Sequence, residues 1–393
     1  MPYQGLSRFL LLPNLNLEKK VSLGRTSNLF LCSKVGEGCE ICPKCAQPSS
    51  SRYDSRVISV RDEPIRGSQV VLKIKKYRYY CKTCRKPFTE PVEGIMPRRK
   101  TTQRYRRSLL WAATTFSDLS KVKQAYACSN ALIYKIVYEQ LELKSREIRN
   151  PWPKSIGIDE HMFSRSSPER FVTVLTDHTN RRVKETVHGK TSQSLHEQLK
   201  HIPGRENVRW ITLDLSDTYK KFCFEFFPNA ELIADKFHVL RLLTPHLIRR
   251  RKDIAPSRFT RKAKRLLLMS SHKLDFFDRS TIRKFLSQFP ELEELYSWKE
   301  RLHGFYRIKG HKRAQKALEA MILELQASIL PELRTLGRTL SRWKNEVLNY
   351  FINRLTNART EGFNNVAKLV IKRAYGYKSY RNYRLRLLSA CGF

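Results

Sequence analysis

The stretch KSIGIDEHMF, residues 154–163, decides the fold class of this chain, together with the two runs that follow it, RFVTVLTDH (170–178) and RRVKETV (181–187). These runs are short and rich in β-branched and other β-forming residues, which is typical of strands. Thr179 and Asn180 mark the second turn. Three adjacent strands joined in this way predict an antiparallel meander.

Helices and strands alternate after the meander. Helical spacing behind Ser or Thr start residues predicts helices at TSQSLHEQLKHI (191–202) and SDTYKKFCFEFF (216–227). NVRWITLDL (207–215) and AELIAD (230–235) are predicted strands, and they need those helices as crossover connections. This order of elements predicts an α/β protein with a ribonuclease H-like mixed sheet core.

The net charge sets this chain apart from an average soluble protein. Among 393 residues, 76 Lys and Arg stand against 36 Asp and Glu, which gives +40. Such an excess repels itself unless it meets a polyanion, so nucleic acid is the leading partner and an anionic membrane the second. No apolar run is long enough to span a bilayer, and the N-terminus lacks a signal-peptide pattern, so we expect no membrane partner.

Two CxxC pairs indicate a metal site. Cys42 and Cys45 form one pair and Cys81 and Cys84 the other, with 35 residues between them. This spacing lets four thiolates converge on one tetrahedral Zn²⁺. VVLKIKKYRYY (70–80) alternates like a hairpin strand, so we predict a zinc ribbon with a long arm and a structural Zn²⁺; redox-active cysteines are the alternative. Two further cysteines are predicted free thiols, with a second metal site left open, and these are Cys32 and Cys39.

Residues 116–140, FSDLSKVKQAYACSNALIYKIVYEQ, predict a helix-turn-helix. Ser129 caps the second helix, which carries Tyr134 and Lys135 at positions that would meet bases. The basic connector PRRKTTQRYRR (97–107) comes before it and favours DNA binding. An ordinary helical hairpin is the alternative.

Two acids lie on the predicted core strands. Alternation in SIGIDE places Gly157 and Asp159 on one face, and Asp214 ends the fourth strand. The first and fourth strands are neighbours in this topology, so both acids approach one point and could share Mg²⁺. A lone buried Asp is more often a helix cap or an ion-pair partner, and Asp217 and Glu160 are near enough to be the ligands instead.

A third acid must come from the helix that packs across that point. Glu346 and Glu361 are the candidates. Glu361 lies among amides in TNARTEGFNN (356–365), at the start of a long basic run. That helix would press Glu361 onto the sheet while its basic residues face DNA.

The C-terminal run KLVIKRAYGYKSYRNYRLR (368–386) interleaves cations with tyrosines. One interpretation is a phosphate clamp whose tyrosines stack on unpaired bases; the other is a solvated basic face with tyrosines packed on the sheet. The predicted DNA contacts are Lys368, Lys372, Arg373, Lys378 and Arg381.

Several segments resemble the DDE transposases of bacterial insertion sequences, of the ISL-three family type. They are GIDE (157–160), LDLSDTYKKF (213–222), NAELIADKFHVLRL (229–242) and the run from Asn357 to Leu388. Members of that family also begin with a cysteine finger and a helix-turn-helix. The resemblance implies a catalytic triad that holds two Mg²⁺ (or Mn²⁺) ions, formed by Asp159, Asp214 and Glu361, with Asp235 and His238 of the DKFH run as second-tier site residues.

The resemblance also implies a function. We expect a transposase that binds the terminal inverted repeats of its insertion sequence, cleaves strands with Mg²⁺ and joins the 3′-OH to target DNA. Such a protein would act on double-stranded DNA as a homodimer or higher oligomer, in the prokaryotic cytoplasm at the nucleoid. The alternatives are a zinc and helix-turn-helix regulator with an inactive core, and a ribonuclease H-like nuclease without joining activity.

The predicted elements divide the chain into five segments. NPWP (150–153) is a Pro-rich break, and helical periodicity dominates from Lys236 to about Leu355. The expected order is a zinc-binding N-terminal domain (1–96), a helix-turn-helix domain (97–150), the first part of the catalytic core (151–241), a long helical insertion (242–345), and the C-terminal core helix with a basic DNA-contacting tail (346–393).

Overall fold

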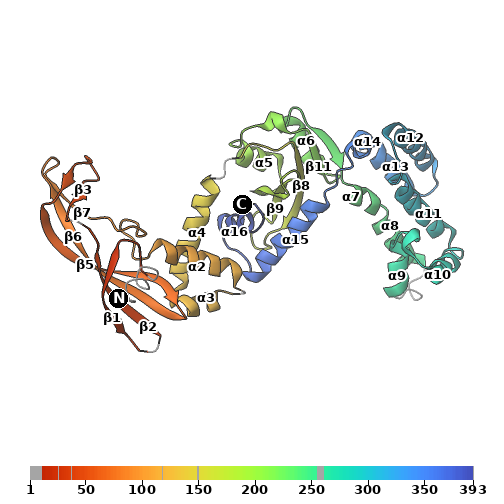
Figure 1. Ribbon diagram of the computed structural model, residues 1–393. Helices are drawn as coiled ribbons and strands as arrows, with labels where there is room; N and C mark the ends of the chain where they lie inside the picture. The colour runs from red at the N-terminus through yellow and green to blue at the C-terminus, as the bar shows by residue number, and fades with distance from the viewer. Residues whose placement is uncertain are drawn as a thin grey trace. The chain divides into compact units, whose positions relative to one another are not determined.

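The computed structural model describes residues 11–24, 26–36, 38–116, 118–147, 150–254 and 261–392, without the side chains of 261–263. The chain divides into two compact units, Met1–Lys144 and Ser145–Phe393 (Figure 1). Each unit has its own sheets and helices, so the protein is of mixed α/β type. Among the described helices, none has the length and hydropathy that a membrane span requires.

A long β-hairpin dominates the first unit. Strands β5 (Arg52–Ile65) and β6 (Ser68–Cys81) pair antiparallel, and they account for most of the 35 residues between the two cysteine pairs. The sheet also contains β1 (Leu15–Ser22), β2 (Ser27–Lys34) and β7 (Lys86–Thr89), in the order β1-β2-β6-β5 with β7 on β6. The long arm expected from the alternating run is therefore confirmed.

Three helices complete the first unit, and these are α2 (Gln103–Thr115), α3 (Leu119–Tyr126) and α4 (Asn130–Glu147). Thr102 caps α2, and it also donates a hydrogen bond of 2.7 Å to Asp62 of the hairpin. Arg104 forms an ion pair with the same buried carboxylate. The expectation that 97–107 is only a connector is therefore wrong, because its second half is helical and tied to the sheet.

A five-stranded sheet lies at the centre of the second unit. It consists of β8 (Ser155–Met162), β9 (Phe171–Asp177), β10 (Arg182–His188), β11 (Trp210–Leu213) and β12 (Glu231–Ala234). The first three form the expected antiparallel meander, and β11 pairs parallel with both β8 and β12. The spatial order is β10-β9-β8-β11-β12, so the first and fourth strands are neighbours, as predicted.

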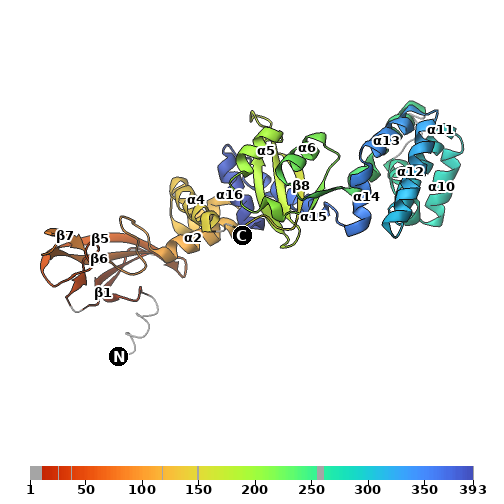
Figure 2. The same cartoon turned by 90° about the horizontal axis from the view of Figure 1, so that it is seen from above.

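Helices cover both faces of this sheet (Figures 1 and 2). On one face, α5 (Ser192–Leu199) and α6 (Asp217–Phe226) pack on Ile156 and Ile158 in a continuous apolar core. The other face is covered by α15 (Ala358–Arg373) and α16 (Tyr380–Cys391). Gly157 faces α15, where a Cβ would lie 2.3 Å from Oγ1 of Thr360, so only glycine allows this close approach.

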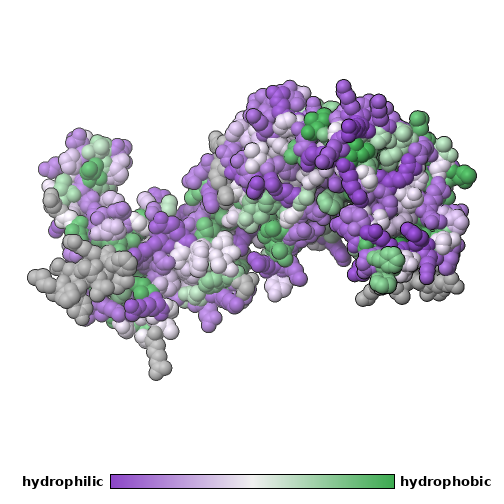
Figure 3. All heavy atoms as spheres, turned by 45° about the vertical axis from the view of Figure 1, so that its right-hand side comes forward, coloured by the Kyte–Doolittle hydropathy of each residue, from purple (hydrophilic) through white to green (hydrophobic). Residues whose placement is uncertain are grey.

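A helical tract separates β12 from α15, as the periodicity predicted. It shares its apolar core with the α5/α6 face of the sheet, and Asn349 ties it to β12 by donating to the carbonyl of Leu232 at 2.9 Å. Polar side chains cover most of the face shown in Figure 3. The helices of this tract are α7 (Lys236–Arg241), α8 (Thr244–Ile254), α9 (Arg261–Leu268), α10 (Phe276–Leu286), α11 (Pro290–Phe305), α12 (His311–Ala327), α13 (Pro331–Arg342) and α14 (Lys344–Asn353).

Candidate active site

Two carboxylates meet on neighbouring strands of the second unit. Asp159 lies in β8, and Asp214 directly follows β11, which pairs with β8. Burial and the nearby charge of Asp214 raise the pKa of the Asp159 carboxyl to about 7. Two such acids repel one another unless a cation neutralises them.

His238 connects Asp214 with Asp235, the residue that precedes α7. Nδ1 of His238, on α7, donates to Oδ2 of Asp235 at 3.0 Å and lies 2.9 Å from Oδ1 of Asp214. These two carboxylates raise the pKa of His238 to about 10, so the imidazole is protonated at neutral pH. Ligand atoms of the three residues lie within 4.8 Å of one another.

Asn357 fastens the start of α15 to the sheet. Its backbone N–H donates to Oδ1 of Asp235 at 3.0 Å, and its Nδ2 donates to the carbonyl of Ile158 at 2.9 Å. Its Oδ1 accepts a hydrogen bond of 3.1 Å from Thr212 on β11. Asp235 therefore links the helix that carries Glu361 to the histidine beside Asp214.

Asn364 makes the second connection between α15 and the acids. Its Nδ2 donates to Oδ2 of Asp159 at 2.8 Å, and its Oδ1 lies 3.1 Å from Nδ1 of His161. Nε2 of His161 lies 2.7 Å from the hydroxyl of Tyr383 on α16. Burial lowers the pKa of His161 to about 4, so its ring is neutral.

Glu361 is exposed on the first turn of α15. It precedes Asn364 by one helical turn, and residues three apart on a helix are neighbours on its surface. Because Asn364 contacts Asp159, Glu361 lies on the helical turn directly before that contact. Among the described residues, the close group of Asp214, Asp235 and His238 includes neither Glu361 nor Asp159.

The other acids that the sequence left open are engaged elsewhere. Asp217 is exposed at the start of α6, Glu160 alternates to the face of β8 opposite Asp159, and Glu346 is buried in α14. Each has a cationic neighbour, at 3.2, 3.8 and 2.7 Å respectively, and these are Arg342, Lys190 and Lys220.

The four predicted zinc ligands come together in the first unit. Cys42 and Cys45 lie in the turn between β3 (Glu40–Ile41) and β4 (Pro48–Ser49). Cys81 is the last residue of β6, and Cys84 lies in the turn between β6 and β7. Their sulfur atoms are all within 4.8 Å of one another. Backbone amides, chiefly that of Lys44, lower the pKa of Cys42 to about 7, which favours the thiolate. Four thiols at this distance fit a structural zinc ion.

The predicted recognition helix is α4. Ala127 is left-handed at φ 43°, and Oγ of Ser129 accepts a hydrogen bond of 3.3 Å from the N–H of Leu132. The expected turn and cap are therefore present. Tyr134 and Lys135 are exposed on the first turns of α4.

The basic C-terminal run has two parts. The five predicted DNA contacts, Lys368, Lys372, Arg373, Lys378 and Arg381, are all exposed. Tyr380 and Tyr383 instead pack with Phe163 and the sheet, so these two tyrosines follow the second interpretation of the run. Arg384 forms hydrogen bonds of 2.7 and 2.5 Å with Glu185 of β10.

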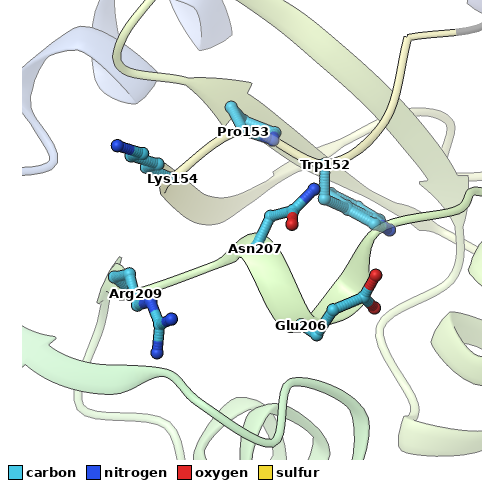
Figure 4. A pocket seen from close by; sticks show the side chains of 6 residues that line it. All are labelled: Trp152, Pro153, Lys154, Glu206, Asn207 and Arg209. Carbon is cyan, nitrogen blue, oxygen red and sulfur yellow. The ribbon is translucent and has the colours of Figure 1, made fainter.

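A hollow of about 300 Å³ lies at the end of the sheet where β8 and β11 begin (Figure 4). Lys154 and Arg209 in its lining directly precede β8 and β11, whereas Asp159 and Asp214 lie toward the other ends of these strands. The hollow is therefore separate from Asp159 and Asp214. The remaining lining residues are Trp152, Pro153, Glu206 and Asn207.

The residues predicted from the sequence do not include four residues of this site, and these are Asn357, His161, Asn364 and Tyr383. Two signals were available. His161 follows Asp159 by two positions and so shares its face of β8, and Asn364 follows Glu361 by three positions and so shares its side of the helix. Nothing in the sequence indicates that Tyr383 reaches His161.

Comparisons with known proteins identify the family of this chain. A family described as transposase matches residues 156–387, and one described as the zinc-finger of transposase IS204/IS1001/IS1096/IS1165 matches residues 40–84. The transposase for insertion sequence element IS1001 of Bordetella parapertussis is 23% identical over 380 residues, which cover 93% of this chain and 92% of that protein. The first match spans more than half of the chain, and the chain therefore belongs to the ISL3 family of DDE transposases.

Proposed function

We propose that this protein binds the ends of its insertion sequence, cleaves DNA strands there and joins the 3′-OH to target DNA. The observation that carries the proposal is the meeting of Asp159 and Asp214 on neighbouring strands under the helix that bears Glu361. An antiparallel meander followed by two parallel strands supports a ribonuclease H-like core.

The acids of this site fit a divalent cation. Carboxylate oxygens are the ligands that Mg²⁺ and Mn²⁺ prefer. Among the described residues, the buried Oδ1 of Asp214 accepts no aligned hydrogen bond, and Asp159 carries a raised pKa beside it. A cation held by Asp159, Asp214 and Glu361 would relieve this repulsion. Two such ions would activate a water or 3′-hydroxyl and stabilise the leaving oxygen.

The remaining residues of the site hold the acids in place. Protonated His238 balances the charge of Asp214 and Asp235, and Asp235 holds the first turn of α15 through the N–H of Asn357. Lys368 lies two turns beyond Glu361 on the same helix and is exposed, so it would meet a phosphate of the strand that reaches the acids.

The first unit would supply recognition. A zinc ion on Cys42, Cys45, Cys81 and Cys84 would stabilise the hairpin, because four thiolates leave no open position for catalysis. Exposed Tyr134 and Lys135 on α4 would contact base edges of the terminal repeats. Two cleavage sites at two ends favour action as a dimer or higher oligomer on DNA.

Cleavage of a duplex that carries the element ends, with and without Mg²⁺, tests the proposal. Asp159→Asn, Asp214→Asn and Glu361→Gln should each abolish cleavage, because the amide removes a metal ligand at nearly constant shape, while end binding persists. Asp217→Asn is the matched control, since this exposed acid pairs with Arg342 and should be dispensable. Near-normal Mg²⁺-dependent cleavage by a triad variant would remove that residue from the site. Binding of the ends without any cleavage by the wild type would favour a regulator with an inactive core.

A further inference from the structure

Four side chains form one hydrogen-bonded chain that ends on Asp159. The order is Tyr383, His161, Asn364 and Asp159, with separations of 2.7, 3.1 and 2.8 Å. The first three are at most 4% exposed. They come from α16, β8 and α15, so the chain crosses the interface between the sheet and its two C-terminal helices.

The hydrogen bonds that lead to Asp159 run in one direction, from donor to acceptor. The ionised carboxylate of Asp159, which is the form that binds a cation, only accepts, so Asn364 must present its Nδ2 to it and its Oδ1 to His161. Nδ1 of His161 must then donate, which leaves Nε2 of the neutral ring to accept from the Tyr383 hydroxyl. With Asp159 ionised, each group therefore has one role.

The Tyr383 hydroxyl holds the far end of this arrangement. Without it, the buried Nε2 of His161 would lose its hydrogen-bond donor, and the ring would keep only its bond to Asn364. Asn364 would then rest on a less well-held partner. If its amide turned, its Oδ1 would face Oδ2 of Asp159, where two oxygens repel.

We infer that Asn364, oriented by His161 and Tyr383, is a positioning residue that fixes the carboxylate of Asp159 for cation binding. The inference rests on the proposed function, since it assigns Asp159 a metal ion. Outer hydrogen-bond partners of a ligand set its orientation, and their loss typically weakens metal affinity about 10- to 100-fold.

The affinity of the site for a cation can be measured directly, without DNA or turnover. The full-length protein is titrated with Mn²⁺, and electron paramagnetic resonance reports the free ion. Asn364→Ala should raise the Kd for Mn²⁺ about 10-fold or more, and Tyr383→Phe should raise it several-fold while keeping the buried ring. The double variant should be no worse than Asn364→Ala alone, because the two residues act in series. Thr360→Val is the matched control: it breaks the 2.6 Å contact with Thr176 in the same interface but does not touch Asp159.

Each outcome decides the matter. If Asn364→Ala and Thr360→Val both lower the melting temperature but leave the Kd unchanged, the chain serves packing only and the inference is overturned. Additive effects of Asn364→Ala and Tyr383→Phe would also overturn it, because the residues would then act separately. A wild-type Kd equal to that of Asp159→Asn would instead show that Asp159 binds no ion, and the proposed function would fail with it.

Discussion

A Cβ on Gly157 would lie 2.3 Å from Oγ1 of Thr360, closer than any side chain tolerates. The same Cβ would lie 2.5 Å from Oδ1 of Asn357. Thr360 and Asn357 are buried and hydrogen-bonded, so neither can move aside cheaply. The absence of one methyl group on β8 therefore allows α15 to reach the carboxylates.

Gly157→Ala should lower the free energy of unfolding by about 1–3 kcal/mol, because the extra methyl forces α15 away from the sheet. Urea denaturation of the full chain measures this. Gly362→Ala is the control on the same helix, where a Cβ meets nothing within 4 Å. It should raise stability by about 0.5–1 kcal/mol, since alanine favours a helix interior. Equal effects of the two substitutions would contradict the close approach.

Cys84→Ser should release the zinc ion and unfold the end of the hairpin, because metal binding at such sites supplies folding free energy. Elemental analysis and circular dichroism of the purified variant follow both changes. Cys39→Ser should retain the metal, since Cys39 is exposed and, among the described cysteines, stands outside the group of four. Wild-type protein that contains no stoichiometric zinc would exclude the site.

Replacing Lys372 and Arg373 with Ala should weaken binding to cognate and unrelated DNA alike. The salt slope should fall by roughly one for each lost phosphate contact. Arg384→Ala is the control, because this cation of the same run is engaged with Glu185 and should change stability rather than the salt slope. An unchanged slope in the double variant would place Lys372 and Arg373 away from DNA.

Tyr375→Gly should make the protein more stable. Tyr375 is 98% exposed and lies at φ 52°, at the end of α15 where its N–H donates to Lys372 and that of Gly376 to Ile371. Glycine is favoured in this left-handed position. Relief of strain, offset in part by the looser unfolded chain, should raise the free energy of unfolding by about 1 kcal/mol. Ala374→Gly, at φ −89°, should destabilise the protein, and the reverse order would refute the assigned turn.

Stability should fall as pH is lowered from 6.5 to 4 in a way that depends on His178. Burial lowers the pKa of His178 to about 4 in the fold, so in this window the unfolded chain takes up a proton that the folded chain does not. Asp159 works in the opposite direction, and the comparison must therefore be with His178→Gln. Between pH 6.5 and 5 the wild type should lose roughly 1 kcal/mol more than this variant. Parallel pH profiles in urea denaturation would contradict the burial of a neutral ring.

The meander and the two crossover helices could be predicted because each depends on local patterns. β8 and β9 are short runs rich in apolar and β-branched residues, as strands covered on both faces are. Thr191 caps α5 by accepting from Ser194 at 3.1 Å. The helical tract was equally clear from its periodicity. These are features that a short window of sequence determines.

The elements that were misjudged depend on distant partners. The start of α2 was predicted to be a basic connector, but Arg104 pairs with Asp62 of the hairpin, which lies far away in the sequence. For the C-terminal run the sequence left two interpretations open, and only the fold shows that α16 buries Tyr383 and Leu387 against the sheet. The chain of amides and hydroxyls at Asp159 was invisible for the same reason, since its members lie on three elements.

The position of α15 also has a consequence for the order of synthesis. Asp159 and Asn364 are separated by 205 residues, and the whole helical tract lies between them. At about 5–20 residues per second, a ribosome needs roughly 10–40 seconds to pass from one to the other. During that time the sheet can form, but the helix that completes its carboxylate site has not yet been made. A nascent or truncated chain therefore carries the unit with the four cysteines but no finished carboxylate site. Under the proposed function, cutting must wait until nearly the last residue is added.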